Sequence, residues 1–381
     1  MNTLNYIGSK HTLFNTILKI CNENIPEKKN LTFMDMFAGT GTIGFHIQDH
    51  FKSVCANDLE QYSYIINCAL LQCNYSPKLQ QIIDDCNTFT ISTPSTVVSG
   101  VPSLFATLTP GAFGYGSLQE NDDLTTKNLI YKNYSPNDTC ERMFFTSENA
   151  KKCDIIRVHI EKLFKVSQEI TVEEYRFLLA SLLVSTDKIA NTTSVYGAYL
   201  KQYKKSALKP LILTPIHKKT NIVVSNNSVF NMLAESITEK CDVVYIDPPY
   251  NQRQYAANYS PLNYIAQYNS EVVLTGKTGL IKDYNKSKFC SKPQVKTVFI
   301  ELIKNIQCRY IIMSYNNEGL LDIDTLKTIL NEKGDVKLYK IQYNKFKAQQ
   351  NVAKKHTEEY VWFVDTGKKN GIIEEITICV I

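Results

Sequence analysis

Apolar runs alternate with helix-like segments in the first part of the chain. The apolar run Leu31–Phe37 predicts a strand, and the spacing that follows predicts a helix from about residue 42 to residue 50. A second strand is predicted over Ser53–Asn57, with a helix over about 61–73. This alternation is typical of a parallel sheet covered by helices.

The alternation resumes after about residue 220 and continues almost to the C-terminus. The pattern predicts a short strand, a helix and a buried strand, then a strand, a helix and two closing strands, at Asn221–Val224, Val229–Glu239, Asp242–Ile246, Tyr310–Ser314, Ile323–Glu332, Val336–Tyr343 and Tyr360–Val364. The two closing strands have no helix between them. We therefore expect the sheet to end in an antiparallel hairpin.

Residues 87–215 interrupt this pattern. The stretch is first rich in Ser, Thr, Asn, Pro and Gly. It then predicts a helix from about residue 147 to 164 and another from Thr171, where Glu174 completes a capping box. Two ordinary crossover units would need only about 60 residues. We expect residues 1–86 and 216–381 to form one domain, with 87–215 as an inserted region. A second irregular, lysine-rich stretch covers about 270–298.

Composition places the chain among ordinary globular proteins, and its charge is unevenly distributed. The 381 residues are 44% hydrophobic and 21% charged, with a net charge of +5. Seven lysines and no acid lie in Lys188–Ala234, and six lysines with one acid lie in Lys277–Ile300. Each stretch is either a solvated lysine-rich surface or a set of phosphate contacts.

Targeting and metal signals are missing from the sequence. Eleven cysteines without a C-x-x-C pair, no secretory segment and no apolar run of about 18 residues predict a cytoplasmic protein without a membrane partner. His46 and His50 are four residues apart, but no third ligand lies nearby. We expect no metal site.

A glycine-rich turn directly follows the first strand. Gly39, Gly41 and Gly44 match the G-x-G-x-x-G pattern, and Asp58 follows the second strand at the distance expected of an acid that binds a ribose. Glycines allow the backbone to approach an adenosine-containing ligand closely. The pattern alone does not distinguish NAD, FAD and S-adenosylmethionine.

The tetrapeptide Asp247-Pro248-Pro249-Tyr250 follows the buried strand at the edge of the sheet where ligands bind. The prolines remove two donors and leave carbonyl oxygens that accept. A carboxylate and a carbonyl can accept both hydrogens of an exocyclic amino group, which localises the lone pair on its nitrogen. The ring of Tyr250 can stack on a base.

These motifs together resemble the DNA adenine-N6 methyltransferases of the Dam and restriction–modification kind. Asn5–Lys10, Asp35–Gly41, Asn57–Glu60 and Asp247–Tyr250 resemble the N-terminal, cofactor-loop, ribose and catalytic boxes of that family. The resemblance implies a Rossmann-like α/β methyltransferase sheet with an inserted DNA-recognition domain. It also implies cofactor contacts from Tyr6, Lys10, Asp35, Phe37, Gly39, Gly41, Asp58 and Asp247, with Glu60 as an alternative ribose ligand.

The same resemblance implies the substrate and the partners. S-adenosylmethionine would donate the methyl group without a metal, and the target adenine of double-stranded DNA would be flipped out of the duplex. A cognate restriction endonuclease is a possible partner. We expect DNA contacts from Lys201, Lys204, Lys205 and Arg253. Relatives often carry an acid that meets the cofactor's adenine, where this chain has Ser225–Ser228. A neutral amide or hydroxyl can still bond the adenine edge, so we expect an altered cofactor affinity at most.

Three other functions stay open at this point. The same motifs would serve methylation of RNA adenine or of cytosine N4, and analysis of the modified nucleoside would reveal it. A catalytically silent DNA-binding protein could share the fold, although the intact Asp247–Tyr250 box opposes this. The glycine turn alone would also fit an NAD-dependent oxidoreductase.

Overall fold

A mostly parallel eight-stranded sheet forms the centre of the molecule. The computed structural model describes residues 1–6, 12–90, 127–343 and 358–380. In spatial order the strands are β10 (Ile373–Val380), β8 (Asp335–Tyr343), β9 (Glu359–Asp365), β7 (Tyr310–Asn316), β4 (Val243–Ile246), β1 (Thr32–Asp35), β2 (Ser53–Asn57) and β3 (Ser228–Phe230). Every pairing among five of these strands is parallel, namely among β1, β2, β3, β4 and β7. The expected parallel α/β sheet is confirmed.

Helices cover both faces of this sheet. The helices α1 (Phe14–Asn24) and α2 (Thr42–Ile47) pack with Phe33 and Val243 on one face. The helices α10 (Val295–Asn305) and α11 (Ile323–Asn331) pack with Met34 and Val244 on the other. Adjacent residues of one strand thus enter different cores, as the two-residue repeat of a strand requires. Both faces of these strands are covered, as in other parallel sheets.

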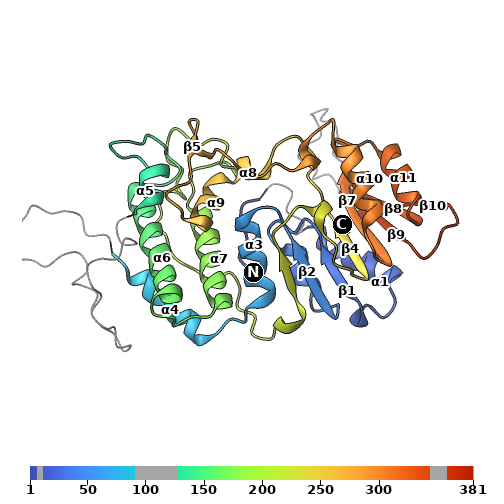
Figure 1. The fold of residues 1–381 in the computed structure, drawn as a ribbon, viewed down its shortest axis with the longest axis horizontal. Coiled ribbons are helices and arrows are strands. Elements are labelled where there is room, and N and C mark those ends of the chain that lie inside the picture. Colours follow the sequence, from blue (N-terminus) through green and yellow to red (C-terminus); the bar gives the residue numbers. More distant parts are fainter. Residues whose placement is uncertain (7–11, 91–126, 344–357, 381) are drawn as a thin grey trace, which may run out of the picture.

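The remaining helices form a second, mainly helical part of the molecule (Figure 1). They are α3 (Gln61–Gln72), α4 (Pro77–Thr88), α5 (Leu129–Tyr134), α6 (Ser147–Lys165), α7 (Val172–Lys188), α8 (Tyr255–Asn258) and α9 (Ser260–Gln267). Their shared core also takes in Ile281 of the small hairpin formed by β5 (Leu274–Thr275) and β6 (Leu280–Ile281). The predicted capping box of Thr171 and Glu174 is present at the start of α7.

The closing part of the sheet contains the expected antiparallel hairpin and one further strand. The strands β8 and β9 pair antiparallel, as predicted. β9 also pairs antiparallel with β7, so it lies between two strands that precede it in the chain. The unpredicted strand β10 pairs parallel with β8 and ends the sheet on that side.

The predictions for residues 221–239 are wrong. The segment contains a 3-10 turn at Val224–Asn226, the strand β3 and a second 3-10 turn at Ala234–Ser236. Val229 packs against the core on one face of the sheet and Phe230 against the core on the other. This alternation and the pairing with β2 outweigh the helical spacing of the apolar residues. The stretch 270–298 is likewise not entirely irregular, because it contains the β5–β6 hairpin and the start of α10.

Candidate active site

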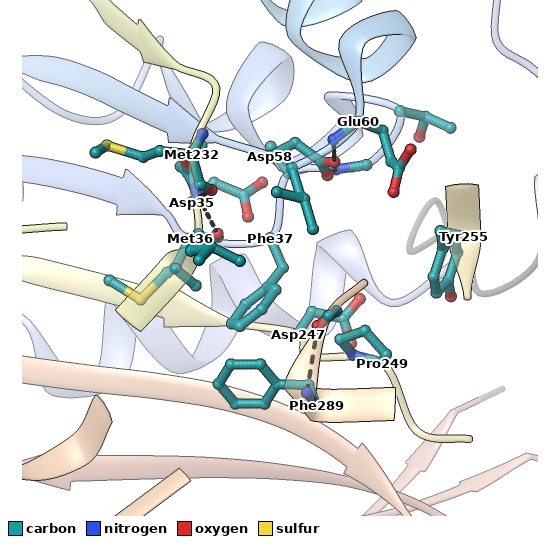
Figure 2. A pocket seen from close by; sticks show the side chains of 18 of the residues that line it. Asp35, Met36, Phe37, Asp58, Glu60, Met232, Asp247, Pro249, Tyr255 and Phe289 are labelled. Atoms are coloured by element: carbon teal, nitrogen blue, oxygen red, sulfur yellow. Dashed lines mark hydrogen bonds between the residues drawn. The ribbon is translucent and has the colours of Figure 1, made fainter. Parts of the chain in front are cut away.

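A cavity opens at the carboxyl ends of β1, β2 and β4, with about 880 Å³ of empty space that includes its opening to solvent. The registers Asp35↔Ala56 and Asp35↔Tyr245 bring these three strand ends side by side. The lining includes seven of the predicted site residues, namely Tyr6, Asp35, Phe37, Gly39, Asp58, Asp247 and Pro249. Figure 2 shows Phe37 between Asp58 and Asp247. Local motifs far apart in sequence therefore meet in one place.

The glycine turn has the conformation that its sequence predicts. Gly39 and Gly41 have φ values of +51° and +72°, which L side chains rarely adopt. A Cβ at Gly39 would lie 3.2 Å from the Tyr6 ring, and one at Gly41 would lie 2.6 Å from a methyl group of Leu70. Gly41 closes the turn by donating its N–H to the Ala38 carbonyl oxygen. Both glycines are thus required by backbone shape and by space.

Asp58 holds this turn from the end of β2. Its Oδ2 accepts the Gly39 N–H at 2.7 Å, and its Oδ1 accepts the Glu60 N–H at 2.9 Å. The Gly39 carbonyl oxygen accepts the hydroxyl of Ser63 at 2.5 Å. Burial raises the pKa of the Asp58 carboxyl above its usual range. Asp58 therefore links the loops that follow β1 and β2.

Two further acids line the cavity beside Asp58. Burial, followed by the charges of Asp247 and Asp58, raises the pKa of Asp35 well above its usual value. The Oδ1 atom of Asp35 is buried without a hydrogen-bond partner among the described residues. Burial and the charge of Asp58 raise the pKa of Glu60 to about 8, while its Oε2 accepts the side-chain amide of Asn263 at 2.7 Å. An acidic cavity with an unpartnered carboxylate oxygen suits a cationic ligand.

Stacked tyrosines form one wall of the cavity. The Tyr6 ring stacks on Tyr259 at 4.7 Å and lies 5.4 Å from the ring of Tyr255, which also lines the cavity. The preceding residue, Asn5, donates its backbone N–H and its side-chain amide to Asp187 at the end of α7, at 2.7 and 3.0 Å. The N-terminal segment is thus fixed between the helical part and the sheet. Lys10 lies outside the described residues.

The predicted catalytic box leaves the buried strand β4 and enters a network of hydroxyl groups. Asp247 Oδ1 accepts the Tyr250 hydroxyl at 2.5 Å and the Ser314 hydroxyl at 2.9 Å. The Ser314 hydroxyl also bonds the hydroxyl of Tyr245 at 2.7 Å. The Tyr250 ring lies 4.7 Å from Tyr315. Pro248 is buried beside the cavity, and Gly41, Pro248 and Tyr250 adjoin lining residues without lining the cavity themselves.

The residues predicted to contact DNA differ in their availability. Lys201, Lys205 and Arg253 are exposed, and none of them forms an ion pair within the described part of the chain. Lys204 is half-buried and donates its ammonium to the Thr192 carbonyl oxygen at 2.7 Å. Lys204 is therefore tied to its own loop.

Some residues of the site were not predicted. Tyr255 follows the Asp247–Tyr250 box by five residues, and Ser314 ends the strand predicted over Tyr310–Ser314, but no motif assigned either residue a role. Phe289, which packs edge-on against Phe37 at 5.0 Å, comes from the supposedly irregular stretch and has no sequence signal. The residues that line the cavity after β3 are Met232–Glu235.

Asn227, one of the residues 225–228 considered for the adenine edge of a cofactor, has both side-chain polar atoms bonded elsewhere. Its side-chain oxygen accepts the Val54 N–H at 2.9 Å, and its amide donates to the Leu71 carbonyl oxygen at 2.9 Å. These bonds hold it between β2 and α3, away from the cavity lining. His46, the other residue considered for ligand binding, packs between the rings of Phe14 and Phe45.

Comparisons with known proteins agree with this geometry. The family model of the D12 class N6 adenine-specific DNA methyltransferases matches residues 6–329. The chain is 38% identical over 373 residues to the Type II methyltransferase M.NlaIII of Neisseria lactamica, covering 95% of this chain and 99% of that protein. It is 36% identical to M.CviAII of Paramecium bursaria Chlorella virus 1, covering 96% and 99%. It is 33% identical to M.FokI of Planomicrobium okeanokoites, covering 95% of this chain and 52% of that protein.

Proposed function

This chain belongs to the family of D12 class N6 adenine-specific DNA methyltransferases, and we propose that its cavity binds S-adenosylmethionine beside a flipped-out target adenine. Family membership makes the protein an adenine-specific DNA methyltransferase. It also excludes the alternative function of an NAD-dependent oxidoreductase, which the glycine turn alone would fit. The observation that carries the proposed site is the meeting of Asp35, Asp58 and Asp247 around one cavity.

The residues present fit this cofactor. S-adenosylmethionine carries an α-ammonium group and a sulfonium whose methyl group is the group transferred. The unpartnered Oδ1 of Asp35 suits a cationic group, and Asp58 suits the ribose hydroxyls. Gly39 and Gly41 keep the turn free of side chains, and Tyr6 forms a flat wall. Phe37 and Phe289, which both line the cavity, offer aromatic contacts for an adenine ring.

We assign the chemistry to the Asp247–Tyr250 box. The Asp247 carboxylate and the Pro248 carbonyl would accept the two hydrogens of the adenine amine, which localises the lone pair on the nitrogen. The ring of Tyr250 would stack on the base, and orientation of the amine would supply most of the acceleration. Neither a metal nor a covalent enzyme intermediate is part of this scheme.

The inserted region would hold the DNA. We propose residues 1–86 and 216–381 as the catalytic domain and residues 87–215 as the inserted target-recognition region. Lys201, Lys205 and Arg253 are exposed and would contact phosphates, whereas Lys204 is bonded to the Thr192 carbonyl and would hold the conformation of its loop. The similarity to Type II methyltransferases supports a role as the modification enzyme of a restriction–modification system, with a cognate endonuclease as partner. Of the described helices, none has the length and apolar character needed to cross a membrane.

The test is to incubate plasmid DNA with S-adenosylmethionine and the wild-type protein or its Asp247→Ala variant, and to map modified bases by modification-sensitive sequencing. We expect N6-methyladenine at a defined site with the wild type. The variant should lose nearly all transfer, at least about 100-fold, while its DNA affinity stays unchanged. Asp242→Ala is a matched control, since Asp242 bonds the Thr32 backbone at the opposite end of β4. Near-normal turnover by Asp247→Ala would contradict the proposed role.

A further inference from the structure

A buried chain of hydroxyl groups leads from the sheet to the proposed catalytic carboxylate. The strands β4 and β7 pair in parallel with Ile246 opposite Met313, so the next residues, Asp247 and Ser314, lie side by side at the strand ends. Tyr245 precedes Asp247 by two residues and therefore projects from the same face of β4. The pairing of two strands thus brings these three side chains together, although 67 residues separate Asp247 from Ser314.

The direction of the hydrogen bonds in this chain follows from the groups involved. Ser314 has one hydroxyl proton, which it donates to Asp247 Oδ1 at 2.9 Å. The 2.7 Å bond between Ser314 and Tyr245 must therefore be donated by Tyr245. Burial, aided by the nearby Asp247 charge, raises the pKa of Tyr245 well above its usual value, so its hydroxyl keeps its proton. Tyr245 and Ser314 are 1% and 0% exposed, so bulk solvent does not compete for their hydroxyl groups.

We propose that Tyr245 and Ser314 are positioning residues that act in series to fix the orientation of the Asp247 carboxylate for adenine N6 methylation. The proposal rests on the proposed function, because it assigns a role relative to Asp247. Without the Ser314 hydroxyl, the carboxylate would lose a fixed donor from β7 and could rotate about its Cβ–Cγ bond. Without the Tyr245 hydroxyl, Ser314 would lose the bond that holds its own rotamer. Tyr245 also lines the cavity, but its hydroxyl bonds Ser314 and not Asp247, so we assign its effect on the carboxylate to Ser314.

This arrangement separates the role of the two residues from that of Tyr250. Tyr250 also donates to Asp247 Oδ1, but it lies in the loop after the two prolines, where its ring packs against Tyr315 of β7. Ser314 and Tyr245 lie within paired strands, where the backbone holds their positions. A donor on a strand can maintain the carboxylate while Tyr250 rearranges around a base. The rigid part of the network is thus the part that we assign to positioning.

The test measures single-turnover methyl transfer with S-adenosylmethionine and cognate DNA at saturation, together with the dissociation constant for each. We expect Ser314→Ala to slow transfer about 10- to 100-fold and Tyr245→Phe about 3- to 10-fold, with both dissociation constants unchanged. The double variant should transfer at the Ser314→Ala rate within about twofold, because residues acting in series are not additive. Ser314→Thr, which keeps a hydroxyl, should recover most of the activity.

The matched control is Tyr268→Phe. Tyr268 is also a buried tyrosine whose hydroxyl donates to a buried carboxylate, Asp154, at 2.6 Å, but it belongs to the helical part. We expect this variant to transfer methyl groups at the wild-type rate. Tyr245→Phe removes a single oxygen atom, so it tests the idea even if Ser314→Ala does not fold.

Three results would overturn this inference. They are a wild-type rate for Tyr245→Phe, effects that multiply in the double variant, and a loss that appears in cofactor affinity instead of in the transfer rate. Failure of the proposed function is distinguishable from all three. In that case the wild-type protein itself would produce no N6-methyladenine, or Asp247→Ala would remain active.

Discussion

Glu60 should make the stability of the protein fall as the pH rises toward about 9. Its carboxyl is 7% exposed, and burial with the adjacent Asp58 charge raises its pKa from 4.5 to about 8. The folded state therefore binds the proton more tightly than the unfolded state. The stabilisation from this proton is complete below the unfolded pKa and is lost as the pH rises through about 8.

The size of the effect follows from the shift. Each unit of pKa corresponds to about 1.4 kcal/mol, so the free energy of unfolding should lose about 2 to 3 kcal/mol between about pH 6 and about pH 9. Glu60→Gln has no titrating proton but can still accept the amide of Asn263 that Glu60 Oε2 accepts at 2.7 Å. The free energy of unfolding of the variant should therefore rise by that amount relative to the wild type between the same two pH values.

Urea unfolding can measure this difference. Trp362, the single tryptophan of the sequence, is fully buried in β9, and its fluorescence reports unfolding. The control is Asp154→Asn, since the pKa of Asp154 is raised only to about 6. The gap between that variant and the wild type should change by less than about 0.5 kcal/mol over the same pH range. If the free energy of unfolding depends on pH in the same way for the wild type and for Glu60→Gln, the reasoning is refuted, because Glu60 would then not titrate in this pH range.

Two other substitutions test the glycine turn and the proposed DNA-contacting surface. Gly41→Ala should lower the free energy of unfolding by about 2 to 4 kcal/mol in the same urea assay, because φ is +72° and its Cβ would lie 2.6 Å from Leu70. Gly44→Ala, which meets nothing closer than 3.6 Å, should change stability by less than about 1 kcal/mol, and equal losses at the two glycines would contradict this account. Arg253→Ala should weaken DNA binding and reduce the salt dependence of log K by about one unit in fluorescence anisotropy titrations, whereas Lys19→Ala on α1 should leave it unchanged.

The parts of the site that the sequence predicts correctly are those fixed by the end of a strand. Asp58 and Asp247 each follow a short buried strand, and parallel strands end at the same edge of a sheet. The positive φ values of Gly39 and Gly41 follow from the sharp turn after β1. In each case the chemistry and the structural signal occupy the same few residues.

The unpredicted parts depend on pairing between distant segments. Ser314 reaches Asp247 only because β7 pairs with β4 in one register, and a shift of one residue would turn Ser314 to the other face. Phe289 reaches Phe37 from a lysine-rich stretch without periodicity. The strand β3 has only three residues, which is too short for its two-residue repeat to be recognised beside the helical spacing of residues 229–239. Its identity as a strand depends on β2.

The position of β4 in the middle of the sheet has a consequence for how the chain folds. β4 pairs with β1, and the bond between Thr32 and Asp242 joins residues 210 positions apart. Closing so long a loop costs conformational entropy before any pairing energy is returned, which slows folding. During synthesis β1 and β2 emerge early. The edge of β1 that pairs with β4 stays unpaired until β4 has been synthesised, which is after most of the helical part. Asp247 thus joins the glycine turn late, and the nascent chain carries an open strand edge that a chaperone could protect.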